Sequence, residues 1–74
     1  MDNVRQFTSW GEYVTVITKS GGKYKDVTLS PDPYDPYSRN HHLENRHGTY
    51  EVVPTKELHG VIRPGNDRLY LLSV

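Results

Sequence analysis

The sequence predicts an all-β protein. Its 74 residues include no alanine but eight valines and six tyrosines, a composition typical of strands rather than helices. Short stretches of β-branched and aromatic residues alternate with turns that contain glycine or proline, which predicts several short strands. Five such strands in so short a chain favour a small, strongly bent five-stranded barrel, because a flat sheet would expose its edges and one apolar face.

The length predicts a single domain that spans residues 1–74. Nine basic and nine acidic side chains give a net charge of zero, so the broad attraction of a basic protein to phosphate or membranes is absent. The lack of cysteine excludes a disulfide scaffold and cysteine-ligated zinc. No membrane-spanning or signal segment is recognisable, and we therefore expect a cytoplasmic protein that does not enter membranes.

The first segment of the chain permits two interpretations. Asp2 can cap a short N-terminal helix through Phe7, in which Val4 and Phe7 share one face and Gly11 provides a stop. An edge strand over residues 4–8 is the alternative, because the segment is too short for periodicity to decide.

A hairpin follows. Residues 12–19 are dense in β-branched and aromatic side chains, and Ser20-Gly21-Gly22 supplies the positive φ of a tight turn. The return strand, residues 23–29, is expected to stop at Ser30-Pro31. Its alternation places two sets of side chains on opposite faces: Lys25, Val27 and Leu29 on one, and Tyr24, Asp26 and Thr28 on the other.

Residues 30–47 are predicted to form a long loop rather than a strand. Pro31, Pro33 and Pro36 remove hydrogen-bond donors and restrict their neighbours. The segment also repeats Asp-Pro-Tyr at residues 32–37 and is rich in histidine. Loops of this length in small domains are usually functional or disordered.

Three more strands are expected in the second half of the chain. They cover residues 48–53, 58–63 and 68–74, of which the last is apolar on both faces and calls for cover on both sides. Residues 54–57 read as a bend or single 3₁₀ turn, and residues 64–67 as a turn in which proline presets φ.

The order of these features resembles the Sm-like family of small β-barrels, which assemble into rings that bind RNA. The resemblance rests on three stretches: residues 10–22, which include Val-Thr-Val and the glycine turn; Val27-Thr28-Leu29 with the Asp-Pro-Tyr units; and residues 61–72, which include Ile-Arg-Pro-Gly-Asn. The family has a glycine in its bent second strand where this chain has Lys25 or Asp26, and Pro64 interrupts the family's arginine turn.

The resemblance implies a single-stranded RNA site. Tyr37 would stack on a base, Asn40 would bind the edge of the base, and Arg63, in the turn with Gly65 and Asn66, would cover its other face. A structural interpretation stands beside it: the tyrosine packs the loop, the asparagine makes a turn and the arginine is a solvated strand end. Because only 34% of the residues are hydrophobic, the core is expected to be thin, which favours a homo-oligomer.

A protein-binding module is the alternative function. Tyr34, Tyr37 and Trp10 could supply the large contact areas that are enriched in interfaces. An acidic, tyrosine-bearing loop could occupy a partner's groove, as in a small regulator or inhibitor of the kind that phages encode. The competing interpretation is a plain linker with Trp10 in the core.

The histidines suggest a metal site or a ribonuclease-like site, and neither is favoured. His41 and His42 are adjacent and would point in opposite directions on an extended chain, and no metal-binding spacing occurs. We therefore expect no metal and no cofactor, although His41, His42 and His47 could respond to pH.

An acid–base nuclease would need two of His42, His47 and His59, with Tyr50 or Glu44 as helper and Arg46 for phosphate. No catalytic motif supports that composition. The sequence therefore favours a non-catalytic binding module, with single-stranded RNA as the first ligand and a protein partner as the second.

Overall fold

The computed structural model describes residues 4–72 and confirms the all-β class. One antiparallel sheet has the strand order β4-β3-β2-β1-β5-β6. The elements are β1 (Val14–Thr18), β2 (Lys23–Pro31), β3 (Asn40–Asn45), β4 (Tyr50–Pro54), the 3₁₀ turn η1 (Thr55–Glu57), β5 (Leu58–Ile62) and β6 (Leu69–Leu71).

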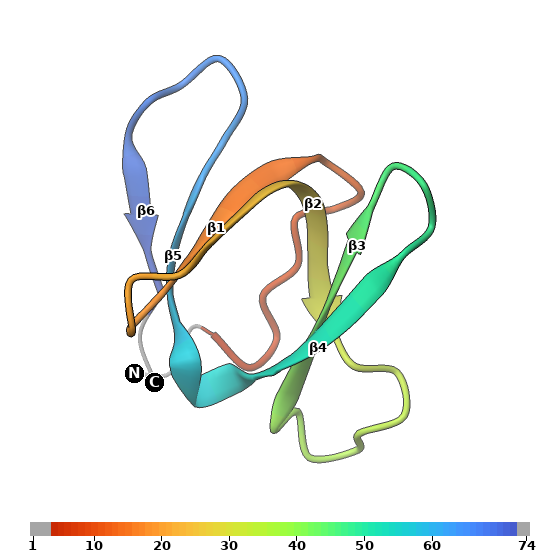
Figure 1. The fold of residues 1–74 in the computed structure, drawn as a ribbon. Helices are drawn as coiled ribbons and strands as arrows, with labels where there is room; N and C mark the ends of the chain where they lie inside the picture. The colour runs from red at the N-terminus through yellow and green to blue at the C-terminus, as the bar shows by residue number, and fades with distance from the viewer. Residues whose placement is uncertain (1–3, 73–74) are drawn as a thin grey trace.

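The sheet is strongly curved but open, so the prediction of a closed five-stranded barrel is wrong (Figure 1). Edge strands β4 and β6 are not paired with each other. The hairpin of β1 and β2, the 3₁₀ turn and the turn before β6 are confirmed. Among the described residues, the last strand covers residues 69–71, which pair with β5, and the predicted end of this strand, residues 73–74, lies outside the described residues.

The additional strand is β3, which lies within the segment that the sequence predicts to be a loop. β2 continues through Pro31, which pairs with His41, and only residues 32–39 remain as the connection. In β3 the side chains of His41 and Leu43 are buried, while Asn40, His42 and Glu44 alternate with them. Burial of every second side chain is therefore what identifies this segment as a strand. Pro31 is tolerated in β2 because it is the last residue of that strand.

The N-terminal segment fills the open side of the sheet instead of forming a helix. In Figure 1 it runs inside the curve of the sheet. Residues 4–7 make only a turn, closed by a 3.1 Å hydrogen bond from Phe7 N to Val4 O, so neither the helix nor the alternative edge strand forms in the described residues. Ser9 N donates to Leu29 O at 2.7 Å, and Ser9 Oγ accepts from Leu29 N at 3.0 Å. The proposed cap, Asp2, lies outside the described residues.

The concave side of the sheet holds the core. Phe7 and Tyr24 pack against its edge. Its buried members come from the N-terminal segment, from β1 to β5 and from the residue after β6: Val4, Val14, Val16, Val27, Leu29, Leu43, Val53, Leu58, Val61 and Leu72.

β2 bends at Asp26 without a glycine. Asp26 has φ +59°, in the left-handed region that glycine usually occupies. The register shifts there, from Val14 opposite Val27 to Val16 opposite Tyr24, as in a β-bulge. Tyr24 and Val27 consequently both face the core, so the predicted alternation is wrong before Asp26.

Candidate functional site

The loop between β2 and β3 is a pair of turns built from the two Asp-Pro-Tyr units. Asp32 Oδ1 accepts a hydrogen bond from Tyr34 N at 3.1 Å, and Asp35 Oδ1 accepts one from Tyr37 N at 3.0 Å. Such aspartate turns are a local alternative to regular structure. They leave Tyr34 93% and Tyr37 68% exposed, so the tyrosines project from an ordered loop and do not pack it onto the sheet.

Asp35 organises the base of this loop. Its Oδ2 atom accepts hydrogen bonds from Arg39 N at 2.6 Å and from Asn40 N at 2.9 Å, and from Asn40 Nδ2 at 3.3 Å. Desolvation opposes ionisation of Asp35, but the hydrogen bonds from Tyr37, Arg39 and Asn40 outweigh it and lower the pKa of its carboxyl group. The ionised carboxylate thus holds Tyr37 and Asn40 in fixed relation.

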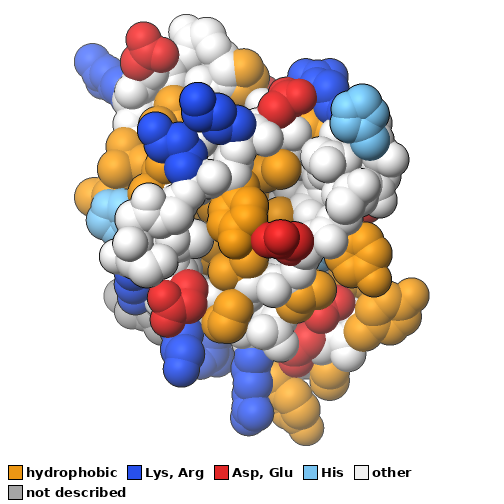
Figure 2. All heavy atoms as spheres, in the orientation of Figure 1, with side chains coloured by type: hydrophobic (Ala, Val, Ile, Leu, Met, Phe, Trp, Pro, Cys, Tyr) orange, Lys and Arg blue, Asp and Glu red, His pale blue; other side chains and the backbone are white. Residues whose placement is uncertain are grey.

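A hollow of about 450 Å³ opens beside these residues, at the end of the sheet where η1 follows β4. We call it the basic hollow, and its lining includes Arg5, Ser38, Arg39, Asn40, Thr55 and Lys56. In Figure 2, lysine and arginine side chains stand along the margin where Figure 1 places η1 and the loop. Cations therefore gather locally on a chain whose net charge is zero.

Arg39 and Asn40 line this hollow, and Tyr37, which is not part of the lining, contacts Arg39. The guanidinium carbon of Arg39 lies 5.2 Å from the centroid of the Tyr37 ring, within the range of a cation–π contact. Because Asn40 Nδ2 donates to Asp35, Asn40 Oδ1 remains an acceptor that has no partner among the described residues. Arg39 and Lys56 form no ion pair with the described residues.

The structure does not bring Arg63, Gly65 and Asn66 to this hollow. They form the turn between β5 and β6, at the opposite end of the molecule from the tyrosine loop (Figure 1). Arg63 is already paired: its Nε atom donates to Glu12 Oε1 at 2.8 Å, and its second guanidinium nitrogen donates to Glu12 Oε2 at 3.3 Å. The Arg63 hydrogen bond lowers the pKa of the Glu12 carboxyl group.

Trp10 lies near Arg63 and is not a core residue. It is 88% exposed and lines a second hollow, of about 260 Å³, which we call the aromatic hollow. Its lining includes Phe7, Trp10, Glu12, Arg63 and Tyr70, and the rings of Phe7 and Tyr70 stack with centroids 5.9 Å apart. Trp10, which the sequence assigns to protein binding, and Arg63, which the resemblance assigns to RNA binding, therefore line the same hollow.

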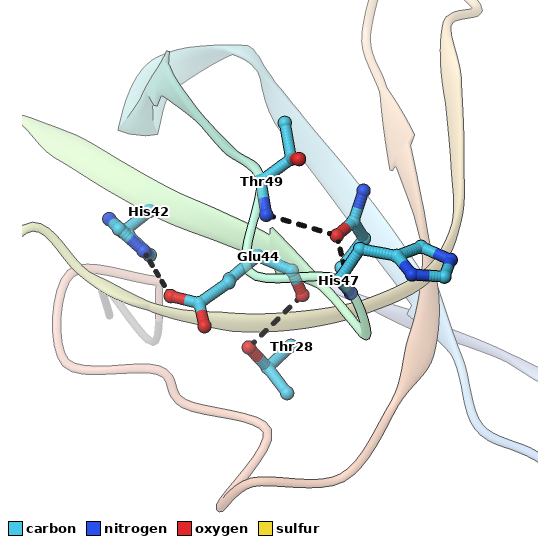
Figure 3. Close-up of polar contacts among 6 residues, drawn as sticks. Thr28, His42, Glu44, His47 and Thr49 are labelled. Carbon is cyan, nitrogen blue, oxygen red and sulfur yellow. Dashed lines mark hydrogen bonds and ion pairs between the residues drawn. The ribbon is translucent and has the colours of Figure 1, made fainter.

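The four histidines are dispersed. His41 is fully buried, and His59 is partly buried on β5. His42 points toward Glu44 on the outer face of β3, whereas His47 lies away from that pair at the turn before β4 (Figure 3). His42, Glu44 and Tyr50 do lie together, with the rings of His42 and Tyr50 stacked at 4.5 Å. Among residues 4–72, no three His, Cys, Asp or Glu side chains are placed to hold a metal ion.

Arg46, the phosphate ligand of the nuclease alternative, lies elsewhere. Its Nε atom donates to Asp26 Oδ2 at 2.7 Å, and its guanidinium carbon lies 4.0 Å from the Tyr13 ring centroid. These contacts hold Arg46 at the bend of β2.

Sequence reasoning missed the cationic part of the basic hollow. Arg5, Arg39 and Lys56 come from three separate segments, and no local motif connects them. Arg39 alone had a usable signal, since it stands between Tyr37 and Asn40 in the sequence.

Comparisons with known proteins identify no relative: no family model matches the chain, and neither the curated proteins nor the solved structures contain a match. Within the part of the chain that the structure describes, no helix has the length and apolar character needed to cross a membrane.

Proposed function

We propose that this protein is a non-catalytic module that binds single-stranded RNA through the basic hollow. The observation that carries the proposal is that Asn40 and three cationic side chains line one hollow, and that the exposed ring of Tyr37 contacts one of these cations, Arg39. Single-stranded RNA is recognised by stacking on aromatic and guanidinium groups and by polar contacts to base edges. The Sm-like resemblance supports the same ligand through Tyr37 and Asn40, but the RNA contact proposed here omits Arg63, Gly65 and Asn66.

Each group has a defined task in this proposal. Tyr37 offers an exposed ring to a base, with Arg39 beside it. Asn40 Oδ1 accepts a hydrogen bond from an amino or imino group on the base edge. Arg39 and Lys56, together with Arg5, attract the phosphates that flank this base, so the affinity depends on salt.

Tyr37→Ala is expected to weaken binding of a short, fluorescently labelled oligouridine about tenfold or more, because stacking on one aromatic ring contributes about 1–3 kcal/mol. Fluorescence anisotropy at several salt concentrations measures both the affinity and its salt dependence. In the same assay, Lys56→Gln is expected to reduce the slope of log affinity against log salt by about 0.7, the value for one phosphate contact on a single strand.

Tyr34→Ala is the matched control, because Tyr34 occupies the same position in the preceding Asp-Pro-Tyr unit. It is expected to leave the RNA affinity unchanged, as is Arg63→Ala. Equal losses for Tyr34→Ala and Tyr37→Ala, or no RNA binding by the wild-type chain, would contradict the proposal. A loss for Arg63→Ala would instead favour the arrangement implied by the Sm-like resemblance.

A second candidate function is self-association through the aromatic hollow and β6. The observation that favours it is the exposure of Trp10 together with Leu69, Tyr70 and Leu71, which are 41%, 51% and 57% exposed on an edge strand. Exposed apolar edges are sites at which a second chain can add. A homo-oligomer would also present several RNA sites together and raise the overall affinity.

Leu71→Lys is expected to lower the solution mass of such an assembly, because it places a charge in the contact. Light scattering on a size-exclusion column measures the mass, and Lys56→Gln serves as the control, because Lys56 belongs neither to β6 nor to the lining of the aromatic hollow. A wild-type chain that remains monomeric at high concentration would refute self-association without affecting RNA binding to the basic hollow.

A further inference from the structure

A third hollow, of about 610 Å³, opens over the outer face of β2, β3 and β4. We call it the outer hollow, and its lining includes Asp32, Tyr34, His42, Glu44, Tyr50 and Val52. The sheet register builds it: Glu44 lies opposite Tyr50, and His42 lies opposite Val52. Neither RNA binding nor self-association, as proposed above, uses this surface.

Aromatic rings form the walls of the outer hollow. Tyr50 stacks on His42 with an angle of 16° between the ring planes and is 58% exposed. Tyr34 reaches the same hollow from the loop and is 93% exposed, so almost no packing restrains its ring. Aromatic faces carry negative electrostatic potential and attract organic cations.

The charge of the lining is negative. Glu44 Oε1 contacts His42 Nε2 (Figure 3), at a distance of 3.1 Å, and Asp32 Oδ1 accepts a hydrogen bond from Tyr34 N. The second carboxylate oxygen of Asp32 and that of Glu44 accept no hydrogen bond from the described residues. None of the described residues that line this hollow is a lysine or an arginine.

We propose that the outer hollow binds an alkylammonium group, held by the Asp32 and Glu44 carboxylates and by the faces of Tyr34 and Tyr50. A phosphate or carboxylate ligand would be repelled by the two carboxylates. An apolar ligand would leave them unpaired, which is costly in a partly enclosed site. An ammonium group satisfies the carboxylates and gains cation–π contacts, while its alkyl chain lies along Val52.

The ammonium group could belong to a free polyamine or to a lysine side chain, and the experiment separates these sources. Spermidine and a short neutral-capped peptide with one lysine are titrated in parallel into the isotopically labelled protein. Amide chemical shifts of residues around Tyr34, Tyr50 and Glu44 report occupation of the site. A parallel titration with sodium chloride at the same ionic strength is the control for a general salt effect. A titration with n-butanol is the control for purely apolar binding.

Shifts confined to this face with spermidine, the peptide or both support the site, and the ligand that binds more tightly identifies the source. Glu44→Gln keeps the size of the side chain and removes its charge, so it is expected to weaken binding about tenfold. Tyr34→Ala is expected to weaken binding several-fold without affecting folding, because Tyr34 makes almost no packing contact. Tyr37→Ala, in the second Asp-Pro-Tyr unit, is the matched control and is expected to bind the amine with wild-type affinity.

Three results would overturn the proposal. The first is no shift with either amine, and the second is equal binding of n-butanol. The third is unchanged affinity in both Glu44→Gln and Tyr34→Ala. Because RNA binding is measured with Tyr37→Ala at a different hollow, failure here leaves the proposed RNA function standing, and failure of RNA binding leaves this test intact.

Discussion

His41→Ala is expected to lower the free energy of unfolding by about 3 kcal/mol, a large fraction of the stability of a domain this small. His41 is fully buried, although it is polar. Its Nε2 atom lies 3.2 Å from Phe7 O, and its Nδ1 atom lies 2.8 Å from Thr55 Oγ1. The ring therefore ties the N-terminal segment and η1 to the start of β3, and truncation leaves both a cavity and unpaired polar groups.

The protonation state of His41 follows from these partners. A carbonyl oxygen can only accept, so Nε2 carries the proton and donates to Phe7 O. The Thr55 hydroxyl lies within hydrogen-bond distance of both Nδ1 and Ser38 O, and its single hydrogen serves one of them at a time. A second proton on Nδ1 would satisfy all three groups, but burial disfavours the charged ring, and the pKa of His41 lies below its ordinary value of 6.5.

This lowered pKa gives the stability a defined dependence on pH. Below about pH 6.5 the unfolded chain binds a proton at this residue before the native protein does, so stability falls as the pH falls. The slope is at most about 1.4 kcal/mol per pH unit, and it ends when the pH passes the lower, native pKa. The pKa values of Glu12 and Asp35 are also lowered, from 4.5 and 3.8. The stability that these two carboxylates contribute is therefore lost only at lower pH than the His41 contribution.

Urea unfolding at about pH 7.5 and about pH 5 measures both effects. His41→Ala is expected to be less stable at the higher pH and to lose less stability on acidification than the wild type. His47→Ala is the control, because His47 is exposed in the turn before β4. Equal acid sensitivity of the wild type and His41→Ala would show that another group causes the loss.

How much of the fold could be predicted depended on whether the signal was local. The hairpin of β1 and β2 was predictable because Val14–Thr18 and the glycine turn are adjacent and typical of strands. β3 was not predictable, because five of its six residues, Asn40–Asn45, are polar. Four of these polar residues are only partly buried, and the fifth is the buried His41. Only tertiary burial of His41 and Leu43 shows that the segment is a strand.

The residues of the candidate site were likewise predictable only where they lie close together in the sequence. Tyr37 and Asn40 were predictable because aromatic and amide side chains lie close together in one loop. Arg5 and Lys56 could not be found, because the fold brings them from the N-terminal segment and η1 to that loop. The competing interpretation, which placed Trp10 in the core, is wrong for a local reason: Trp10 has φ +57° in a turn, and its side chain is exposed.

Gly60→Ala is expected to lower the free energy of unfolding by about 2–3 kcal/mol, because a methyl group at this site meets atoms that cannot all move away. A Cβ atom would lie 2.7 Å from Tyr70 O and 2.8 Å from Leu69 Cδ1. The Leu69 side chain can rotate, but Tyr70 O belongs to the backbone of β6. Since Gly60 pairs with Leu71, β6 would have to separate from β5 to admit the methyl group.

Gly48→Ala separates this steric effect from the conformational cost of replacing a glycine. Gly48 has φ +83° and no atom within 4 Å of an added Cβ, so it is expected to lose only about 1 kcal/mol. Hydrogen exchange adds a local measurement at the Leu72 amide, which donates to His59 O at 2.8 Å. Gly60→Ala should speed exchange at Leu72 more than Gly48→Ala does. If Leu72 stays equally protected in both variants, β6 is not held by its close approach to Gly60, and the exposed edge available for self-association would not depend on that contact.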